Sequence, residues 1–185
     1  MRQKIIHTER LELHHIDAPD LIALYEAQDD RPALAGLDIQ NPHRVLLESK
    51  GPLHWRVPQV KQDPAVNQWF VRWIVLRDTR VIVGSISFHG PPADNGMIEI
   101  GLGIEPLFQN QGLAKEALLG MWRWVLEFPQ VHILRYTVSP NNAPSMALIR
   151  YFGFPSVGSQ IDEVDGVEEI YEIDRKGFIA LWGAQ

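Results

Sequence analysis

The sequence contains no cysteine among its 185 residues. Disulfide bonds, thiolate metal sites and a cysteinyl intermediate are therefore excluded, so any covalent transfer would need another nucleophile. Long apolar runs are also missing: no stretch approaches the roughly 20 residues that a membrane-spanning helix needs. The opening residues MRQKIIHTER lack the apolar segment of a secretory signal. We expect a cytoplasmic protein with no membrane partner.

Basic residues are outnumbered by acidic ones. The chain has 17 Lys and Arg against 23 Asp and Glu, a formal net charge of −6, and no Lys/Arg cluster stands out. We therefore expect no nucleic-acid partner, whereas a cationic amine substrate would suit this charge. The seven histidines do not occur at metal-ligand spacings, so we expect no metal.

Length and patterning predict one α/β (α+β) domain over residues 1–185. Apolar alternation predicts an opening strand at 8–16, a hairpin over 73–88, strands at 97–104 and 131–138, and a final hairpin of 155–161 and 168–173 turning at Asp165-Gly166. Helices are expected after Asp17, over 113–126, in the stretch that begins at Ser139 and ends at Gly153, and near 178–182. The segment 29–68 contains five prolines and reads as irregular apart from a short helical piece at 43–49.

The stretch 97–127 organises the rest of the chain. A strand leads into a polar loop, Gln109-Asn110-Gln111-Gly112, and then into a long amphipathic helix. Because the next strand follows that helix, the two strands should lie parallel in one sheet. No acidic side chain lies between Leu107 and Ala114. The loop thus leaves backbone N–H groups at the positive end of a helix dipole, which is an anion-binding arrangement.

Several motifs together resemble the GNAT superfamily of N-acetyltransferases, in particular its branch of ribosomal-protein N-terminal acetyltransferases (RimJ/RimL-like). They are Thr-Glu-Arg-Leu-x-Leu at 8–13, Gly84-Ser85-Ile86, Glu99-Ile100-Gly101, Gln109-x-x-Gly112-x-Ala114, and Asn142-x-x-Ser145 followed by Gly153-Phe154. The resemblance implies a central mixed, mostly antiparallel sheet of about seven strands, flanked by helices and splayed between 97–104 and 131–138. In this superfamily the region matching 29–68 covers the acceptor.

The same resemblance implies acetyl-CoA as co-substrate and a set of residues that bind it. Loop amides would hold the pyrophosphate, the strand end would pair with the pantetheine arm, and Asn142 would bind that arm from the facing strand. The implied cofactor-binding residues are Leu102, Gly103, Ile104, Gln109, Asn110, Gln111, Gly112, Leu113, Ala114 and Asn142.

For catalysis, the resemblance places Glu99 beside the acceptor as general base. Strand alternation puts Glu99, Gly101 and Gly103 on one face, and a carboxylate in a buried strand should have a raised pKa; the alternative is a surface-facing glutamate. Many relatives protonate the departing thiolate with a tyrosine, but that position here is Ile149. Ser145 is the hydroxyl that remains in the matched positions.

Three functions follow as hypotheses. The first is an acetyl-CoA-dependent N-acetyltransferase that acts on a primary amine, either a peptide N-terminus or a small molecule, by direct attack in a ternary complex. The second is a non-catalytic sensor module that binds acetyl-CoA or CoA. The third, a nucleotide-binding protein, is weaker because no Gly-Lys-Ser/Thr follows the loop glycine. The resemblance is also compatible with a homodimer.

Overall fold

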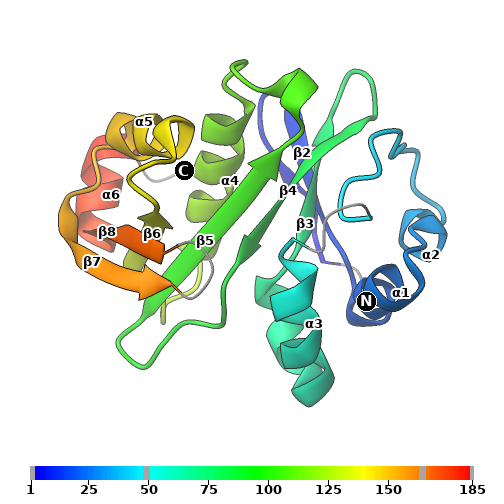
Figure 1. The fold of residues 1–185 in the computed structure, drawn as a ribbon, viewed down its shortest axis with the longest axis horizontal. Coiled ribbons are helices and arrows are strands. Elements are labelled where there is room, and N and C mark those ends of the chain that lie inside the picture. Colours follow the sequence, from blue (N-terminus) through cyan, green and yellow to red (C-terminus); the bar gives the residue numbers. More distant parts are fainter. Residues whose placement is uncertain (1–2, 48–50, 163–165, 184–185) are drawn as a thin grey trace. The chain divides into compact units, whose positions relative to one another are not determined.

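The computed structural model describes residues 3–47, 51–162 and 166–183. Its strands form an open mixed sheet in the order β1-β2-β3-β4-β5-β6-β8-β7, with helices flanking them (Figure 1). The predicted class, with a mostly antiparallel sheet, is confirmed, but the described residues form eight strands rather than about seven. The additional strand is β1 (Ile6–His7), whose two residues are too few to show alternation in the sequence.

The chain forms two compact units, Met1–His89 with Leu102–Met121, and Gly90–Gly101 with Trp122–Gln185. Strand β5 (Met97–Ile104) and helix α4 (Leu113–Val125) run from one unit into the other. Strand β5 has the bounds that its apolar alternation predicts. Helix α4 ends one residue earlier than predicted.

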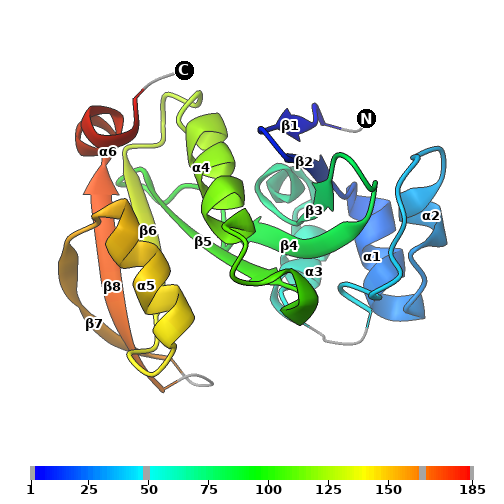
Figure 2. The same ribbon diagram turned by 90° about the horizontal axis from the view of Figure 1, so that it is seen from above.

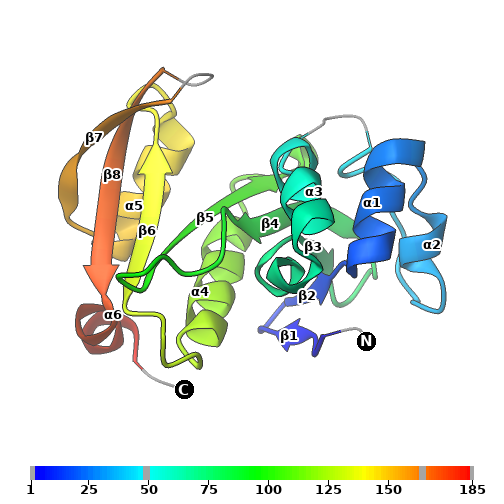
Figure 3. The same ribbon diagram turned by 90° about the horizontal axis from the view of Figure 1, so that it is seen from below.

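The first unit contains an antiparallel meander. Strands β2 (Leu11–His15), β3 (Arg72–Leu76) and β4 (Ile82–Phe88) pair in sequence order, and the predicted hairpin over 73–88 is confirmed. Helices α1 (Ala18–Ala27) and α3 (Leu53–Gln62) pack on each other, with α2 (Arg31–Leu34) and the 3₁₀ helix η1 (Pro64–Trp69) beside them (Figure 3). The part of α4 in this unit packs on the turn between β1 and β2, since a Cβ on Gly120 would meet the Thr8 methyl at 2.8 Å.

The short helix predicted at 43–49 is wrong over the described residues 43–47. Asn41 closes a turn here, because its Oδ1 accepts from the backbone N–H of Val45 at 2.9 Å. Arg44 and Leu46 have φ of +53° and +70°, which no right-handed helix allows. Residues 48 and 49 lie outside the described residues. Helix α3 follows and begins after Pro52.

The second unit holds the parallel pair that the strand–helix–strand order predicts. Strand β6 (Ile133–Val138) pairs with β5 from Met97↔Ile133 to Glu99↔Arg135. Strand β8 (Gly166–Asp174) runs antiparallel to β6, and β7 (Ser156–Asp162) lies outside β8. Asp165 of the predicted turn lies outside the described residues, whereas Gly166 has the positive φ of +75° expected of a turn.

Helices cover this second unit around an aromatic core. Helix α5 (Ala143–Phe152) lies against β6 and ends at Gly153 with φ +72°, as predicted (Figure 2). The predicted short helix near 178–182 is α6 (Arg175–Trp182). The ring of Trp122 lies 4.7 Å from Phe152, 4.8 Å from Phe154 and 5.9 Å from Phe178, centroid to centroid. These contacts hold α4, α5 and α6 together. Among the described residues, no helix is long and apolar enough to cross a membrane.

Candidate functional site

The loop between β5 and α4 is fixed by its own side chains. After the 3₁₀ turn η2 (Pro106–Phe108), the Gln109 amide donates to Ile104 O at 2.8 Å and the Gln111 amide donates to Leu107 O at 3.3 Å. Asn110 and Gly112 take left-handed φ values of +60° and +78°. Residues 109–112 are exposed. The loop is therefore held in place by its hydrogen bonds and is also accessible to a ligand.

Helix α4 presents its amino end to this loop. The backbone N–H of Glu116 donates to Gly112 O, and the amides of Leu113 and Ala114 precede that first helical bond. Leu113 is buried and anchors the turn. A left-handed glycine before free first-turn amides is an arrangement that binds phosphate. The anion site stays a prediction, and this is the backbone geometry that it would use.

The nearest carboxylate on α4, Glu116, is tied to the start of the chain. Its Oε1 accepts from Thr8 Oγ1 and from the Arg10 backbone N–H, both at 2.6 Å, and its Oε2 accepts from Arg10 Nε at 2.7 Å. Burial raises the pKa of Glu116, but these hydrogen bonds outweigh it and the pKa lies below its ordinary value. From the sequence alone, Glu116 is a carboxylate that interacts favourably with the helix dipole, and its partners Thr8 and Arg10 are not indicated.

The end of β5 runs unusually close to β4. A Cβ on Gly84 would lie 2.2 Å from the Gly103 carbonyl oxygen, a distance that only glycine permits. Around Gly103 itself, a Cβ would meet nothing within 4 Å. The segment Leu102–Ile104, predicted to pair with the pantetheine arm, is thus supported closely by β4 and open at Gly103.

Glu99 lies on the second unit's part of β5. It is half-buried between Ile98 and Ile100, which are each 1% exposed, so the predicted alternation holds. Thr137 Oγ1 of β6 donates to Glu99 Oε1 at 2.5 Å. The carboxylate is therefore neither fully buried nor a free surface group, and Thr137 is a partner that the sequence did not indicate.

The start of α5 brings three further polar groups together. Asn142 caps the helix by accepting from the Ser145 backbone N–H at 3.2 Å. Burial raises the pKa of Tyr136 on β6, and the neighbouring Ser145 side chain partly offsets that rise. Ile149 is fully buried, so the position where relatives have tyrosine belongs to the core.

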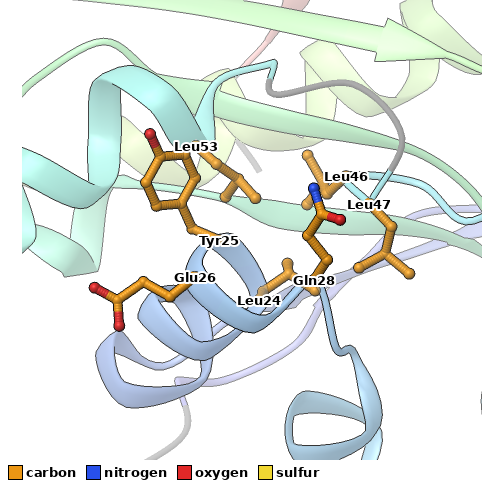
Figure 4. Close-up of a pocket in the computed structure, with 7 residues that line it drawn as sticks. All are labelled: Leu24, Tyr25, Glu26, Gln28, Leu46, Leu47 and Leu53. Atoms are coloured by element: carbon orange, nitrogen blue, oxygen red, sulfur yellow. The ribbon is translucent and has the colours of Figure 1, made fainter.

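A cavity of about 290 Å³ opens in the first unit beside α1 (Figure 4). Leucine side chains and the polar side chains of Tyr25, Glu26 and Gln28 line it. Glu26 is ion-paired with Lys61. The lining residues are Leu24, Tyr25, Glu26, Gln28, Leu46, Leu47 and Leu53. The last three come from the segment that the sequence associated with the acceptor.

Two histidines in β2 have structural partners. His14 shares a hydrogen bond of 2.8 Å with Glu12, and His15 shares one of 2.8 Å with the backbone oxygen of Asn67. Burial lowers the pKa of both imidazoles. Within residues 3–47, 51–162 and 166–183, no three His, Asp or Glu side chains form a group that could hold a metal ion.

Comparison with known proteins gives consistent results. Residues 10–155 match the sequence profile described as an acetyltransferase (GNAT) domain. The uncharacterized N-acetyltransferase YjdG of Bacillus subtilis (strain 168) is 28% identical over 155 residues, covering 81% of this chain and 89% of YjdG.

Solved structures share the fold at low identity. The ribosomal-protein-S5-alanine acetyltransferase of Vibrio fischeri aligns with a TM-score of 0.65 at 15% identity, covering 95% of this chain and 99% of that one. RimL, a ribosomal L7/L12 alpha-N-protein acetyltransferase solved with coenzyme A, aligns with a TM-score of 0.63 at 18% identity, covering 92% and 98%.

Proposed function

Because the chain belongs to the GNAT family of acetyltransferases, we propose that it moves the acetyl group of acetyl-CoA to a primary amine by direct attack in a ternary complex. The observation that carries this proposal is the loop 109–112, in which left-handed Asn110 and Gly112 open onto the amino end of α4. We further propose that residues 1–185 act as one domain and that the enzyme works in the cytoplasm.

The co-substrate would be held mainly by backbone groups. The amides of Gln111, Gly112, Leu113 and Ala114 would bind the pyrophosphate, while Gln109 and Asn110 shape the loop. The backbone of Leu102, Gly103 and Ile104 would pair with the pantetheine arm and polarise the thioester carbonyl. Asn142 uses its Oδ1 to cap α5, so its amide donor is what it would offer a pantetheine carbonyl. That RimL was solved with coenzyme A supports this assignment.

Glu99 would accept the proton of the attacking amine, with Thr137 fixing the carboxylate's rotamer through their hydrogen bond. Ser145 would donate a hydrogen bond to the departing thiolate, which solvent then protonates. Because a free thiol has a pKa of about 8.5, the thiolate leaves with little assistance. Glu99 and Ser145 are thus the proposed catalytic residues.

The acceptor would be an amine of low pKa. An α-amine with a pKa of about 8 costs about 1.4 kcal/mol to deprotonate at pH 7, whereas a lysine near 10.4 costs about 4.6 kcal/mol. A single half-buried carboxylate can deprotonate an α-amine more readily than a lysine side chain. We therefore propose a peptide N-terminus or a small low-pKa amine. The similarity in fold to RimL, a ribosomal L7/L12 alpha-N-protein acetyltransferase, supports the peptide N-terminus.

The test is release of free thiol from acetyl-CoA against a panel of N-terminal peptides, lysine side-chain analogues and small amines. We expect thiol release with one α-amine class and little with lysine analogues. Glu99→Gln should abolish most of this rate, whereas Glu127→Gln, which removes an exposed carboxylate two residues after α4, should not. Tight acetyl-CoA binding without release for any amine would instead favour the sensor module.

A further inference from the structure

Arg10 lies in the turn that precedes β2 and contacts the loop 109–112. Its Nε donates to Glu116 Oε2 at 2.7 Å, and its Nη1 donates to Gln111 O at 3.0 Å. One guanidinium thus bridges the loop and the first turn of α4, across more than 100 residues of sequence. Its third nitrogen, Nη2, lies 3.6 Å from where a Cβ on Gly112 would be.

This third nitrogen is available to a ligand. Among the residues that the structure describes, Nη2 has no hydrogen-bond partner, and 47% of the Arg10 side chain is exposed. Arginine presents its nitrogens in a rigid plane that suits phosphate oxygens. With two nitrogens fixed by the protein, the direction of the third is set beside Gly112.

The charge of Glu116 also explains why Arg10 lies here. A carboxylate in the first turn of α4 interacts favourably with the positive end of the helix dipole, but it would repel a diphosphate bound at the loop. The lowered pKa of Glu116 means that it stays ionised at neutral pH. The guanidinium of Arg10 neutralises this charge, and no other arginine or lysine donates to Glu116 among the described residues.

We propose that Arg10 is a phosphate-binding residue of the acetyl-CoA site, which adds its Nη2 to the loop amides at the CoA diphosphate, and that Glu116 is its positioning residue. This inference rests on the proposed function, because it names a further group of the same site. It assigns a ligand-binding role to the Thr-Glu-Arg-Leu motif, which the sequence places more than 90 residues before the loop.

The test compares a ligand that carries the phosphates with one that lacks them. The dissociation constant of CoA is measured by calorimetry, and that of pantetheine, the same thiol arm without phosphates, by competition with CoA. In Arg10→Gln we expect CoA to bind at least ~10-fold more weakly and pantetheine to bind as in the wild type. Arg10→Lys, which keeps the charge, should recover part of the lost CoA affinity.

Two controls separate binding from folding. Arg77→Gln removes an arginine that donates to Thr8 O and Glu9 O in the same turn without touching the loop, and it should bind CoA as the wild type does. If Arg10→Gln fails to fold, Arg10→Gln/Glu116→Gln removes both charges and keeps hydrogen-bonding groups. That double variant should melt near the wild type and still bind CoA weakly.

The outcomes distinguish this inference from the proposal on which it rests. Equal losses for CoA and pantetheine, or no loss for either in a folded Arg10 variant, would overturn the role of Arg10. A wild-type protein that does not bind CoA would instead overturn the proposed function.

Discussion

Replacing Gly84 by alanine tests whether β4 supports the end of β5 as closely as the structure has it. The new Cβ would start 2.2 Å from the Gly103 carbonyl oxygen, against an ordinary carbon–oxygen contact of about 3.3–3.6 Å. Both groups belong to backbone, so one strand must move by about 1 Å. Such overpacking costs about 1–3 kcal/mol.

Alanine also brings a gain that must be subtracted. Glycine inside a strand is less favourable than alanine by roughly 0.5–1 kcal/mol, because it loses more conformational freedom on folding. With middle values of about 2 and about 0.75 kcal/mol, the net destabilisation is about 1.3 kcal/mol, which lowers the melting temperature by roughly 3–5 °C for a chain of this size. A shift of about 1 Å in the backbone of Leu102–Ile104 should also lower kcat/KM for acetyl-CoA by ~10-fold or more.

Gly103→Ala is the matched control for stability. Its Cβ meets nothing within 4 Å, so it should keep the full entropic gain and melt at or slightly above the wild-type temperature. Calorimetric melting curves of the three proteins, with thiol-release kinetics for Gly84→Ala, measure both effects. A Gly84→Ala protein that melts and turns over like the wild type would refute the close approach of the two strands.

Three further predictions concern the loop, the base and the pH dependence of stability. Gly112→Glu should abolish acetyl-CoA binding in a calorimetric titration, because it combines left-handed strain with a carboxylate at the phosphate; retained affinity would sink the loop assignment. Glu99→Gln should lower kcat by ~10²-fold or more with little change in acetyl-CoA affinity. Thr137→Val should lower kcat by a smaller factor. A wild-type rate that stays constant from pH 6 to 9 would exclude Glu99 as the general base. Burial lowers the pKa of His14 and His15 below the value of about 6.5 that a histidine has in the unfolded chain. Below that pH the unfolded state binds more protons than the folded state, so the free energy of unfolding should fall as the pH drops from about 6.5. Urea titrations that show constant stability from pH 7.5 to 5.5 would contradict this prediction.

Local patterns carried much of the fold. The alternation of β5 gave its bounds, and the glycine at 153 marked the end of α5, because both depend on neighbours within a few residues. The helix predicted at 43–47 was wrong for the opposite reason. A hydrogen bond from the Val45 backbone to the Asn41 side chain and two left-handed residues determine the shape of this segment, and no sequence periodicity indicates them. Strand β1 was missed because two residues are too short to form a pattern.

The candidate site divides in the same way. The loop 109–114 was visible from glycine, polar residues and the helix that follows, all adjacent in sequence. The partners of its charged groups were not: Arg10 meets Glu116 across 106 residues, and Thr137 meets Glu99 across 38. Such pairs depend on which strands become neighbours, and the opening Thr-Glu-Arg-Leu motif was the one available signal for the first of them.

Calorimetric titration of the wild-type protein with acetyl-CoA, CoA and ATP tests the central claim most directly. We predict that each chain binds one molecule of acetyl-CoA or CoA, with a dissociation constant in the micromolar range, and that ATP does not compete. A protein that binds neither acetyl-CoA nor CoA, or that binds ATP in their place, would contradict the assignment of the loop and of the function built on it.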